Sequence, residues 1–164
     1  MSYNATIQNE AQYVNSLGPN VTKDKFHAIY NGILAHWFPV SQGYLIDHQV
    51  LGPAGEVEYI VIRHEGGFRN PLFVVKIKHP SEWTVAGKQM VVDELVDHIK
   101  GQFDFTHYNS IYGLGAIGFH WMVCEIQRSG DHQPTLLVDW QDTITSATSC
   151  FEFDVVAAVV SSLA

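Results

Sequence analysis

The sequence predicts an α/β protein with a central mixed β-sheet flanked by helices. Three β-like runs follow one another between residues 44 and 79, and short turns rich in glycine and proline join them, as in an antiparallel meander. A segment of helical periodicity then separates the third run from the next β region, and such a crossover lets those two strands lie parallel. Further helices are predicted near both ends, which gives the order ααβββαββα.

The N-terminal half begins with two predicted helices, a polar one over residues 4–16 and a more apolar one between Thr22 and Pro39. Their apolar residues recur at helical spacing on one face. These residues are Ile7, Ala11 and Val14 in the first helix and Phe26, Ile29, Tyr30, Ile33 and Trp37 in the second. The strands of the meander are expected at 44–51, 56–63 and 72–79, with turns at 52–55 and 66–71.

The C-terminal half begins with a helix after Pro80, and its apolar stripe predicts that it packs against the sheet. The stripe consists of Val85, Val92, Leu95, Val96, Ile99 and Phe103. The outward side of the helix is expected to carry Asp93, Glu94, Asp97 and Lys100. Residues 111–127 are expected to form another β region and residues 135–140 a further strand. Ser149 is expected to cap a last helix.

Length and charge limit what the chain can do. At 164 residues it is long enough for one hydrophobic core and short for two, so we expect a single domain over 1–164, with a helical extension at 1–20 and a core at 21–164. Its 17 acidic and 9 basic residues give a formal charge of −8. This charge argues against a broadly basic surface and limits nucleic acid binding to a local site.

The start of the chain has neither the basic nor the apolar region of a signal peptide, and no apolar run is long enough to span a membrane. We therefore expect an intracellular protein, cytoplasmic or nuclear, with no membrane partner.

The most informative stretch runs from Glu58 to Lys78, where two predicted strands carry an acid and two lysines. Because side chains alternate along a strand, Lys76 and Lys78 share one face of the third strand. Two like charges about 6 to 7 Å apart repel by roughly 2 to 3 kcal/mol at an effective dielectric constant of about 20, so the pair requires an anion nearby. We expect Glu58, on the neighbouring strand, to point into the same hollow as the two amines.

This order of elements, together with the charged residues, resembles the restriction-endonuclease-like superfamily, the PD-(D/E)xK nucleases, and in particular the small fungal proteins of that fold. The segment VEYIV is similar to the family's PDFxV strand, which places Glu58 at the metal-binding acid and Val57 at the proline. The segment VVKIK is similar to VVExK, which places Lys78 at the motif lysine. Lys76 then stands where the second carboxylate is expected.

The resemblance covers about residues 20–163, which makes 21–164 a nuclease-like core. Gln89, early in the helix after the third strand, is similar to a polar residue often found there, and the resemblance implies that it binds substrate. The segment YGLGAIGFHW is similar to the glycine-rich fourth strand. Glu10 is a candidate for the acidic residue that some members carry on a preceding helix.

The resemblance implies metal-dependent phosphodiester hydrolysis of a nucleic acid, with Mg²⁺ or Mn²⁺ as cofactor. It implies that Glu58 binds the metal and that Lys78 stabilises the negative charge that develops on the phosphate, with Lys76 as the adjacent catalytic candidate. An ammonium at position 76 repels a metal ion that a carboxylate there would help to bind.

Three interpretations remain open. The first is a nuclease with an altered site. The second is a catalytically inactive binding or scaffold protein that keeps the nuclease fold and needs no cofactor. The third is an α/β protein that binds a small acidic ligand at Lys76 and Lys78, in a pocket without Glu58.

Two other kinds of motif favour structural roles. The histidines, among them His48, His64 and His79, have no metal-ligand spacing such as HxH or HExxH. The glycines of GLGAIG lie inside a β region, so we expect them to allow close packing or a bend of the strand and not to cradle phosphate.

The cysteines and tryptophans complete the sequence-based expectations. Cys124 and Cys150 lie far apart and outside any zinc spacing, and we expect both to be reduced packing residues. Trp83 and Trp140 lie in predicted loops or strand ends, where partly exposed aromatic rings are suited to an interaction or homodimer surface.

Overall fold

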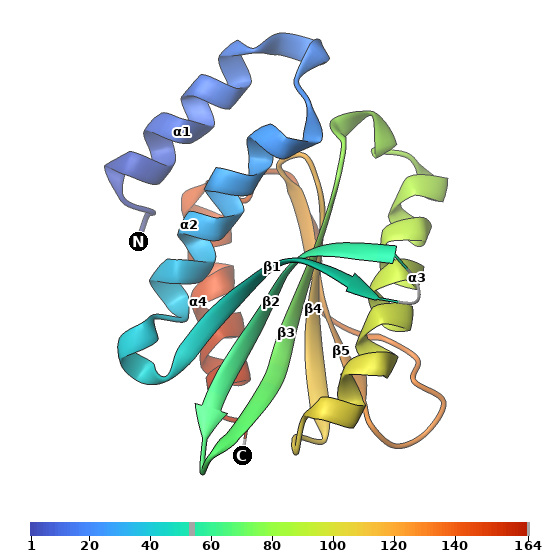
Figure 1. Ribbon diagram of the computed structural model, residues 1–164. Coiled ribbons are helices and arrows are strands. Elements are labelled where there is room, and N and C mark those ends of the chain that lie inside the picture. The colour runs from blue at the N-terminus through green and yellow to red at the C-terminus, as the bar shows by residue number, and fades with distance from the viewer. Residues whose placement is uncertain (53–54, 164) are drawn as a thin grey trace.

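The structure is a computed structural model that describes residues 1–52 and 55–163. Its centre is one six-stranded sheet in which neighbours along the chain are also neighbours in the sheet (Figure 1). The strands are β1 (Tyr44–Gly52), β2 (Gly55–Glu65), β3 (Phe68–Lys78), β4 (Ser110–Ile117), β5 (His120–Gln127) and β6 (Thr135–Gln141). β3 and β4 run parallel, and the other neighbouring pairs are antiparallel. The predicted fold class, a mixed sheet flanked by helices, is confirmed.

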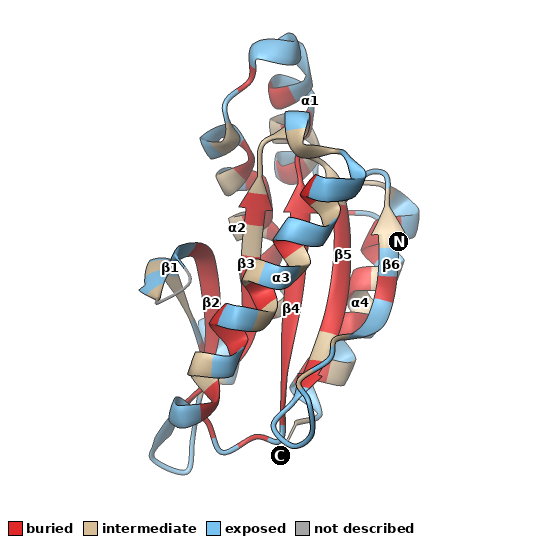
Figure 2. Cartoon of the chain, turned by 90° about the vertical axis from the view of Figure 1, so that its right-hand side faces the viewer, coloured by how far each residue is buried: buried red, intermediate tan, exposed pale blue. Residues whose placement is uncertain are grey.

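Helices cover the two faces of this sheet unequally. On one face, α2 (His27–Trp37) and α4 (Ala147–Ser161) pack on the sheet and α1 (Ala5–Ser16) packs on α2, whereas α3 (Val85–Gln102) covers the opposite face. Figure 2 looks onto α3, which lies in front of buried strand segments. The described chain also contains the 3₁₀ turns η1 (Gly18–Asn20), η2 (Lys23–Phe26), η3 (Val40–Gln42), η4 (Pro80–Glu82) and η5 (Phe103–Phe105).

The starts of the second and the last helix differ from the prediction. The chain forms the turn η2 after Thr22, so α2 begins only at His27. The cap of α4 is Ser146, whose hydroxyl accepts from the N–H of Ser149 at 3.1 Å. Ser149 itself is buried one turn inside the helix, where its hydroxyl accepts from Nε1 of Trp121 at 2.9 Å. The prediction that Ser149 caps the helix was therefore wrong.

The β2–β3 hairpin turn is shorter than predicted. Gly66 and Gly67 form it with φ angles of 60° and 81°, a conformation that glycine adopts without strain. Asn70 and Pro71, expected in the turn, lie inside β3. Proline has no N–H for the ladder, and the pairing with β2 shifts by one residue next to it. Of the turn expected at 52–55, residues 53 and 54 lie outside the described part of the chain.

The predicted β region at 111–127 is a hairpin of two strands, so the order is ααβββαβββα. Gly118, with a φ angle of 60°, reverses the chain between β4 and β5. This adds one strand to the expected number, because hydrophobic alternation alone does not mark a tight turn inside a long β run. The order from α2 to β4 is consistent with the restriction-endonuclease-like fold that the resemblance implies.

The glycines of β4 allow α3 to lie close to the sheet. A Cβ on Gly113 would be 3.0 Å from Cδ1 of Ile99, and one on Gly115 would be 3.3 Å from Cδ1 of Leu95. Close packing was one of the two roles predicted for these glycines, beside a bend of the strand, and it is confirmed for Gly113 and Gly115. It brings α3 over the end of β3, where Lys76 pairs with Gly115 of the parallel strand.

The core lies on both faces of the sheet. Leu95, Ile99 and Cys124 are buried on the α3 face, and Cys150 is buried on the other, with both thiols free. Val85, which the predicted stripe included, is 86% exposed at the first position of α3. Within the described residues, no helix has the length and apolar composition to cross a membrane.

Candidate functional site

Glu58 lies where β2 separates from β3. The two strands pair from Tyr59 and Val75 onward, and Glu58 stands just before the first pair. Its carboxylate is only 1% exposed. Oε2 accepts a hydrogen bond from the backbone N–H of Ile77 at 2.7 Å, and Oε1 accepts from Nζ of Lys23 at 2.7 Å. Glu58 thus fills the gap that opens between the two strands.

A change of face along β2 puts the carboxylate in that position. In a regular strand Val57 and Tyr59 would share a face. Val57 instead packs in the core on the α3 side and Tyr59 in the core on the α2 and α4 side, so the alternation breaks at Glu58. The phenol of Tyr59 donates to the carbonyl of His27 at 2.8 Å, and burial, together with the nearby Glu58 charge, raises its pKa to about 12.

Lys76 and Lys78 point to the α3 face and share one carboxylate. Nζ of Lys78 is 2.9 Å from Oε1 of Glu94, and Nζ of Lys76 is 3.5 Å from Oε2. The side chains of Lys76 and Lys78 are 12% and 19% exposed. Lys76 also donates to the carbonyl oxygen of Glu56 at 2.5 Å. The two amines therefore have an anion beside them, as predicted, but it comes from α3.

Glu58 forms no ion pair with this lysine pair. Among the described residues its only cationic partner within 4.0 Å is Lys23, which reaches it from η2. We expected Glu58 and both amines to point into one hollow, but the observed ion pairs join them to different partners. Two charge clusters lie beside the end of β3: Lys23 with Glu58, and Lys76 and Lys78 with Glu94.

Two members of these clusters were not singled out in the sequence. Lys23 lies 35 residues from Glu58, and no local pattern connects them. Glu94 was placed on the outward side of its helix, and that placement was wrong. It follows buried Val91 by three residues and precedes buried His98 by four, so helical spacing places it at the margin of the buried face. From that margin it reaches β3.

His98 adds an uncharged polar group beside the lysine pair. Its ring is 3% exposed, and neither ring nitrogen has a hydrogen-bond partner among the described residues. Burial lowers its pKa below the usual 6.5, and the charge of Lys76 lowers it further. The ring fits against Gly52, where a Cβ would lie 2.8 Å from Cε1. Neutral His98 therefore adds no positive charge to the cluster near neutral pH.

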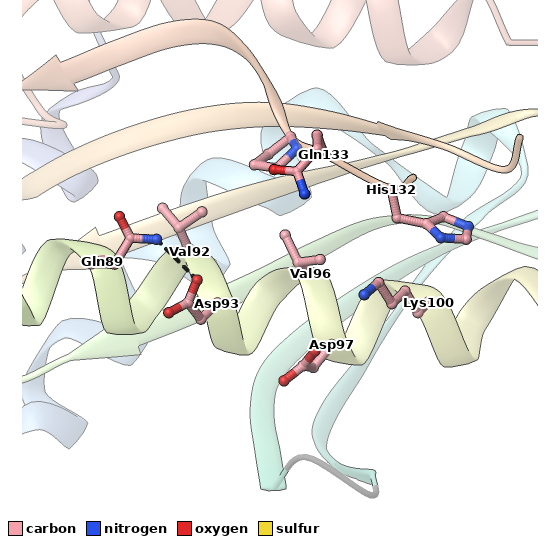
Figure 3. A pocket seen from close by; sticks show the side chains of 9 residues that line it. Gln89, Val92, Asp93, Val96, Asp97, Lys100, His132 and Gln133 are labelled. Carbon is pink, nitrogen blue, oxygen red and sulfur yellow. Dashed lines mark hydrogen bonds between the residues drawn. The ribbon is translucent and has the colours of Figure 1, made fainter. Parts of the chain in front are cut away.

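Gln89 and Glu10 lie apart from both charge clusters. Gln89 is exposed on α3, and its amide donates to Oδ1 of Asp93 at 2.9 Å. It lines a hollow on the flank of α3 that faces the β5–β6 loop (Figure 3). Glu10 is half-buried on α1 and forms no ion pair within the described chain. Substrate binding by Gln89 stays a prediction.

Two hollows follow the β6 side of α3. One, of about 410 Å³, lies between α3 and the β5–β6 loop, and its polar lining includes Asp97, Lys100 and His132 (Figure 3). The other, of about 370 Å³, is more apolar and reaches Leu136 and Trp140 on β6. Neither is lined by a member of the two charge clusters.

The partly exposed tryptophans of the sequence analysis gather beside the second hollow. The rings of Trp83 and Trp140 meet edge to face, with centroids 5.3 Å apart. Trp83 also stacks on His120 at 3.6 Å and lies 4.0 Å from Nζ of Lys88. Both tryptophans are half-buried, as their positions predicted.

The side chains present do not fit a divalent metal ion. Mg²⁺ and Mn²⁺ require several oxygen ligands around one point. No group of three or more His, Cys, Asp or Glu side chains in residues 1–52 and 55–163 is arranged in this way. Each oxygen of Glu58 already faces an N–H donor, one of them the ammonium of Lys23. A cation beside Glu58 would have to displace Lys23.

Comparisons with known proteins give one distant likeness. No family model matches the sequence, and neither does any curated protein. The chain is similar in structure to the type IIG restriction endonuclease BpuSI, with a TM-score of 0.49 and 11% sequence identity. The similarity covers 85% of this chain and 17% of BpuSI, so the chain spans about a sixth of that protein's length.

Proposed function

We propose that this chain is a restriction-endonuclease-like domain that binds phosphate groups of a nucleic acid at Lys76 and Lys78 without hydrolysing them. The observation that carries the proposal is the state of Glu58. Both of its oxygens accept hydrogen bonds, from Lys23 and from the N–H of Ile77. The acid to which the resemblance assigns metal binding therefore already has both oxygens bonded within the chain.

Charge supports phosphate as the ligand. Three lysines and two glutamates make up the two clusters, which leaves one positive charge on a chain of net charge −8. Lys76 and Lys78 are held on one face of β3, at the edge of α3, and lysine ammonium groups bind phosphate as compact point charges. The acidic remainder of the chain limits contact with nucleic acid to this local site.

The absence of hydrolysis follows from the same residues. Phosphodiester cleavage with Mg²⁺ or Mn²⁺ requires carboxylates that gather the metal and orient the attacking water. Lys76 replaces one expected carboxylate, and Glu58, the other, is neutralised by Lys23. In this arrangement Lys76 and Lys78 attract the phosphate, but among residues 1–52 and 55–163 no cluster of acids is arranged to hold a metal ion that would activate the nucleophile.

The first experiment tests catalysis. The protein and a Lys78→Ala variant are incubated with plasmid DNA and with RNA, in Mg²⁺, in Mn²⁺ and in EDTA. We expect no cleavage in any of these conditions. Cleavage that is lost both with EDTA and with Lys78→Ala would overturn the proposal in favour of the nuclease.

The second experiment tests binding, by fluorescence anisotropy of a labelled oligonucleotide over a series of salt concentrations. Replacing both Lys76 and Lys78 by alanine should weaken binding at least about tenfold and reduce the salt slope by about two, because each phosphate contact releases about one counterion. Lys88→Ala together with Lys100→Ala removes the same charge from α3 and should have a smaller effect. Equal effects of the two pairs would contradict the assigned site.

A metal-dependent phosphodiesterase is the second candidate, and one observation favours it. Glu94 provides a carboxylate 2.9 Å from Lys78, so an acid other than the motif acid lies beside the motif lysine. In that case Glu58 and Lys78 have the roles that the resemblance implies. Lys76→Glu restores the expected acid and should increase affinity for Mn²⁺, measured by calorimetry, if the nuclease geometry is retained.

A further inference from the structure

The carboxylate of Glu94 takes the place that an anionic ligand of the lysine pair would take. Two ammonium groups, two positions apart on β3, hold its two oxygens at 2.9 and 3.5 Å. A phosphate group also offers several oxygens to neighbouring cations. Lys76 and Lys78 cannot give full contact to Glu94 and to a phosphate at the same time, because both anions need the same donors.

The contact of Glu94 with Lys76 is the weaker of the two. Oε2 is buried and accepts no hydrogen bond from the described residues, and its distance of 3.5 Å from Nζ of Lys76 is that of an ion pair only. Lys76 directs a shorter bond, of 2.5 Å, to the carbonyl of Glu56. A buried acceptor without a hydrogen bond costs free energy, so Glu94 is held less firmly than a fully bonded carboxylate.

Glu94 also has room to leave. Its side chain is 28% exposed, more than either lysine, and it stands at the margin of the buried face of α3. Its described polar contacts are those with Lys76 and Lys78. Rotation of its side chain toward solvent would release both amines without moving α3 or β3.

We propose that Glu94 is an internal competitor that occupies the lysine pair and sets its affinity for phosphate, and that a phosphate group binds by displacing it. This inference rests on the proposed function, since it concerns the same two lysines. It adds a residue that determines affinity. It predicts that removing the Glu94 carboxylate strengthens phosphate binding far more than removing one negative charge elsewhere on α3.

The test compares Glu94→Gln with the natural protein, using inorganic phosphate and a short DNA duplex as separate probes in calorimetric titrations. We expect Glu94→Gln to bind both probes about tenfold more tightly. Combining it with Lys78→Ala should remove the gain. Glu94→Asp, whose carboxylate is one carbon shorter, should fall between the natural protein and Glu94→Gln, and it provides a second variant should the first fold poorly.

Asp97→Asn is the matched control. Asp97 is exposed on α3, lines the hollow beside the β5–β6 loop and forms no ion pair with Lys76 or Lys78, and its replacement changes the net charge by the same amount (Figure 3). An equal gain from Asp97→Asn would show an effect of net charge and overturn the inference. So would unchanged affinity of folded Glu94→Gln for both probes.

Failure of this inference can be told apart from failure of the proposed function. Metal-dependent cleavage by the natural protein would remove the proposed function and leave the competition between Glu94 and phosphate measurable. A gain for inorganic phosphate but not for the duplex would support the competitor and reject nucleic acid as the ligand.

Discussion

Removing the ammonium of Lys23 should destabilise the fold, because Glu58 would keep a buried charge with only one hydrogen bond. Lys23→Met deletes the charge and retains most of the aliphatic stem. An exposed ion pair contributes about 0 to 1 kcal/mol, and loss of one partner of a buried pair costs roughly 3 to 5 kcal/mol. Glu58 is 1% exposed and Lys23 is 41% exposed, so the pair lies between these limits. We expect a loss of about 1 to 3 kcal/mol.

Urea denaturation measures this loss. With a slope of roughly 2 kcal/mol per molar urea, the midpoint should fall by about 0.5 to 1.5 M. Lys25→Met is the control, because Lys25 is exposed on the same turn and forms no ion pair among the described residues. Its midpoint should stay close to that of the natural protein.

A double-mutant cycle with Glu58→Gln isolates the pair from other effects of the substitutions. The neutral amide should remove most of the cost of Lys23→Met, so the coupling between the two positions should exceed about 1 kcal/mol. A coupling below about 0.5 kcal/mol, with Lys23→Met no worse than Lys25→Met, would refute the view that Lys23 neutralises a buried acid.

Three further predictions concern the surroundings of the site. Gly87→Ala should lower the thermal midpoint by several degrees, since its Cβ would lie 1.9 Å from the carbonyl oxygen of Glu82. A Cβ on Gly101 would have nothing within 4 Å, so Gly101→Ala should leave the midpoint unchanged or raise it. Equal midpoints for the two variants would contradict this packing. Because the pKa of His98 is lowered in the folded state, the unfolded chain binds more protons, and stability should fall as pH drops through the usual value of 6.5 toward the lowered one. His98→Leu should flatten the pH dependence of the unfolding free energy, measured by urea denaturation at several pH values. An unaltered pH dependence would show that other groups bind these protons. Cys124, whose pKa burial raises to about 12, should react with a thiol reagent only after unfolding, so rapid labelling of the native chain at this position would disprove its burial.

The fold was largely predictable because the hydrophobic periodicity of each element agrees with its place. The three strands between residues 44 and 79 and the helix after Pro80 were all found, and the helical crossover correctly made β3 and β4 parallel. The errors in the strands lie where backbone conformation, and not hydrophobic periodicity, determines a turn. Gly118 reverses the chain inside an apolar run, and Pro71 was read as part of a turn although β3 accommodates it next to a shift of register.

The pairing of charges was less predictable, because it depends on which face of each element meets the sheet. Strand alternation placed Lys76 and Lys78 on one face, and the structure agrees. The same rule applied to β2 would have turned Glu58 toward them. It does not hold there, because the packing of Val57 and Tyr59 in opposite cores breaks the alternation at Glu58.

The order of residues alone predicts a mixed sheet flanked by helices, an acidic chain and a pair of lysines that needs an anion. These are properties of period, composition and spacing, which act along a few neighbouring residues. That Glu94 supplies this anion and that Lys23 neutralises Glu58 follows from the packing of distant elements against one another. Both contacts join separate elements of secondary structure, and an ion pair forms only where packing brings its two side chains within a few ångströms.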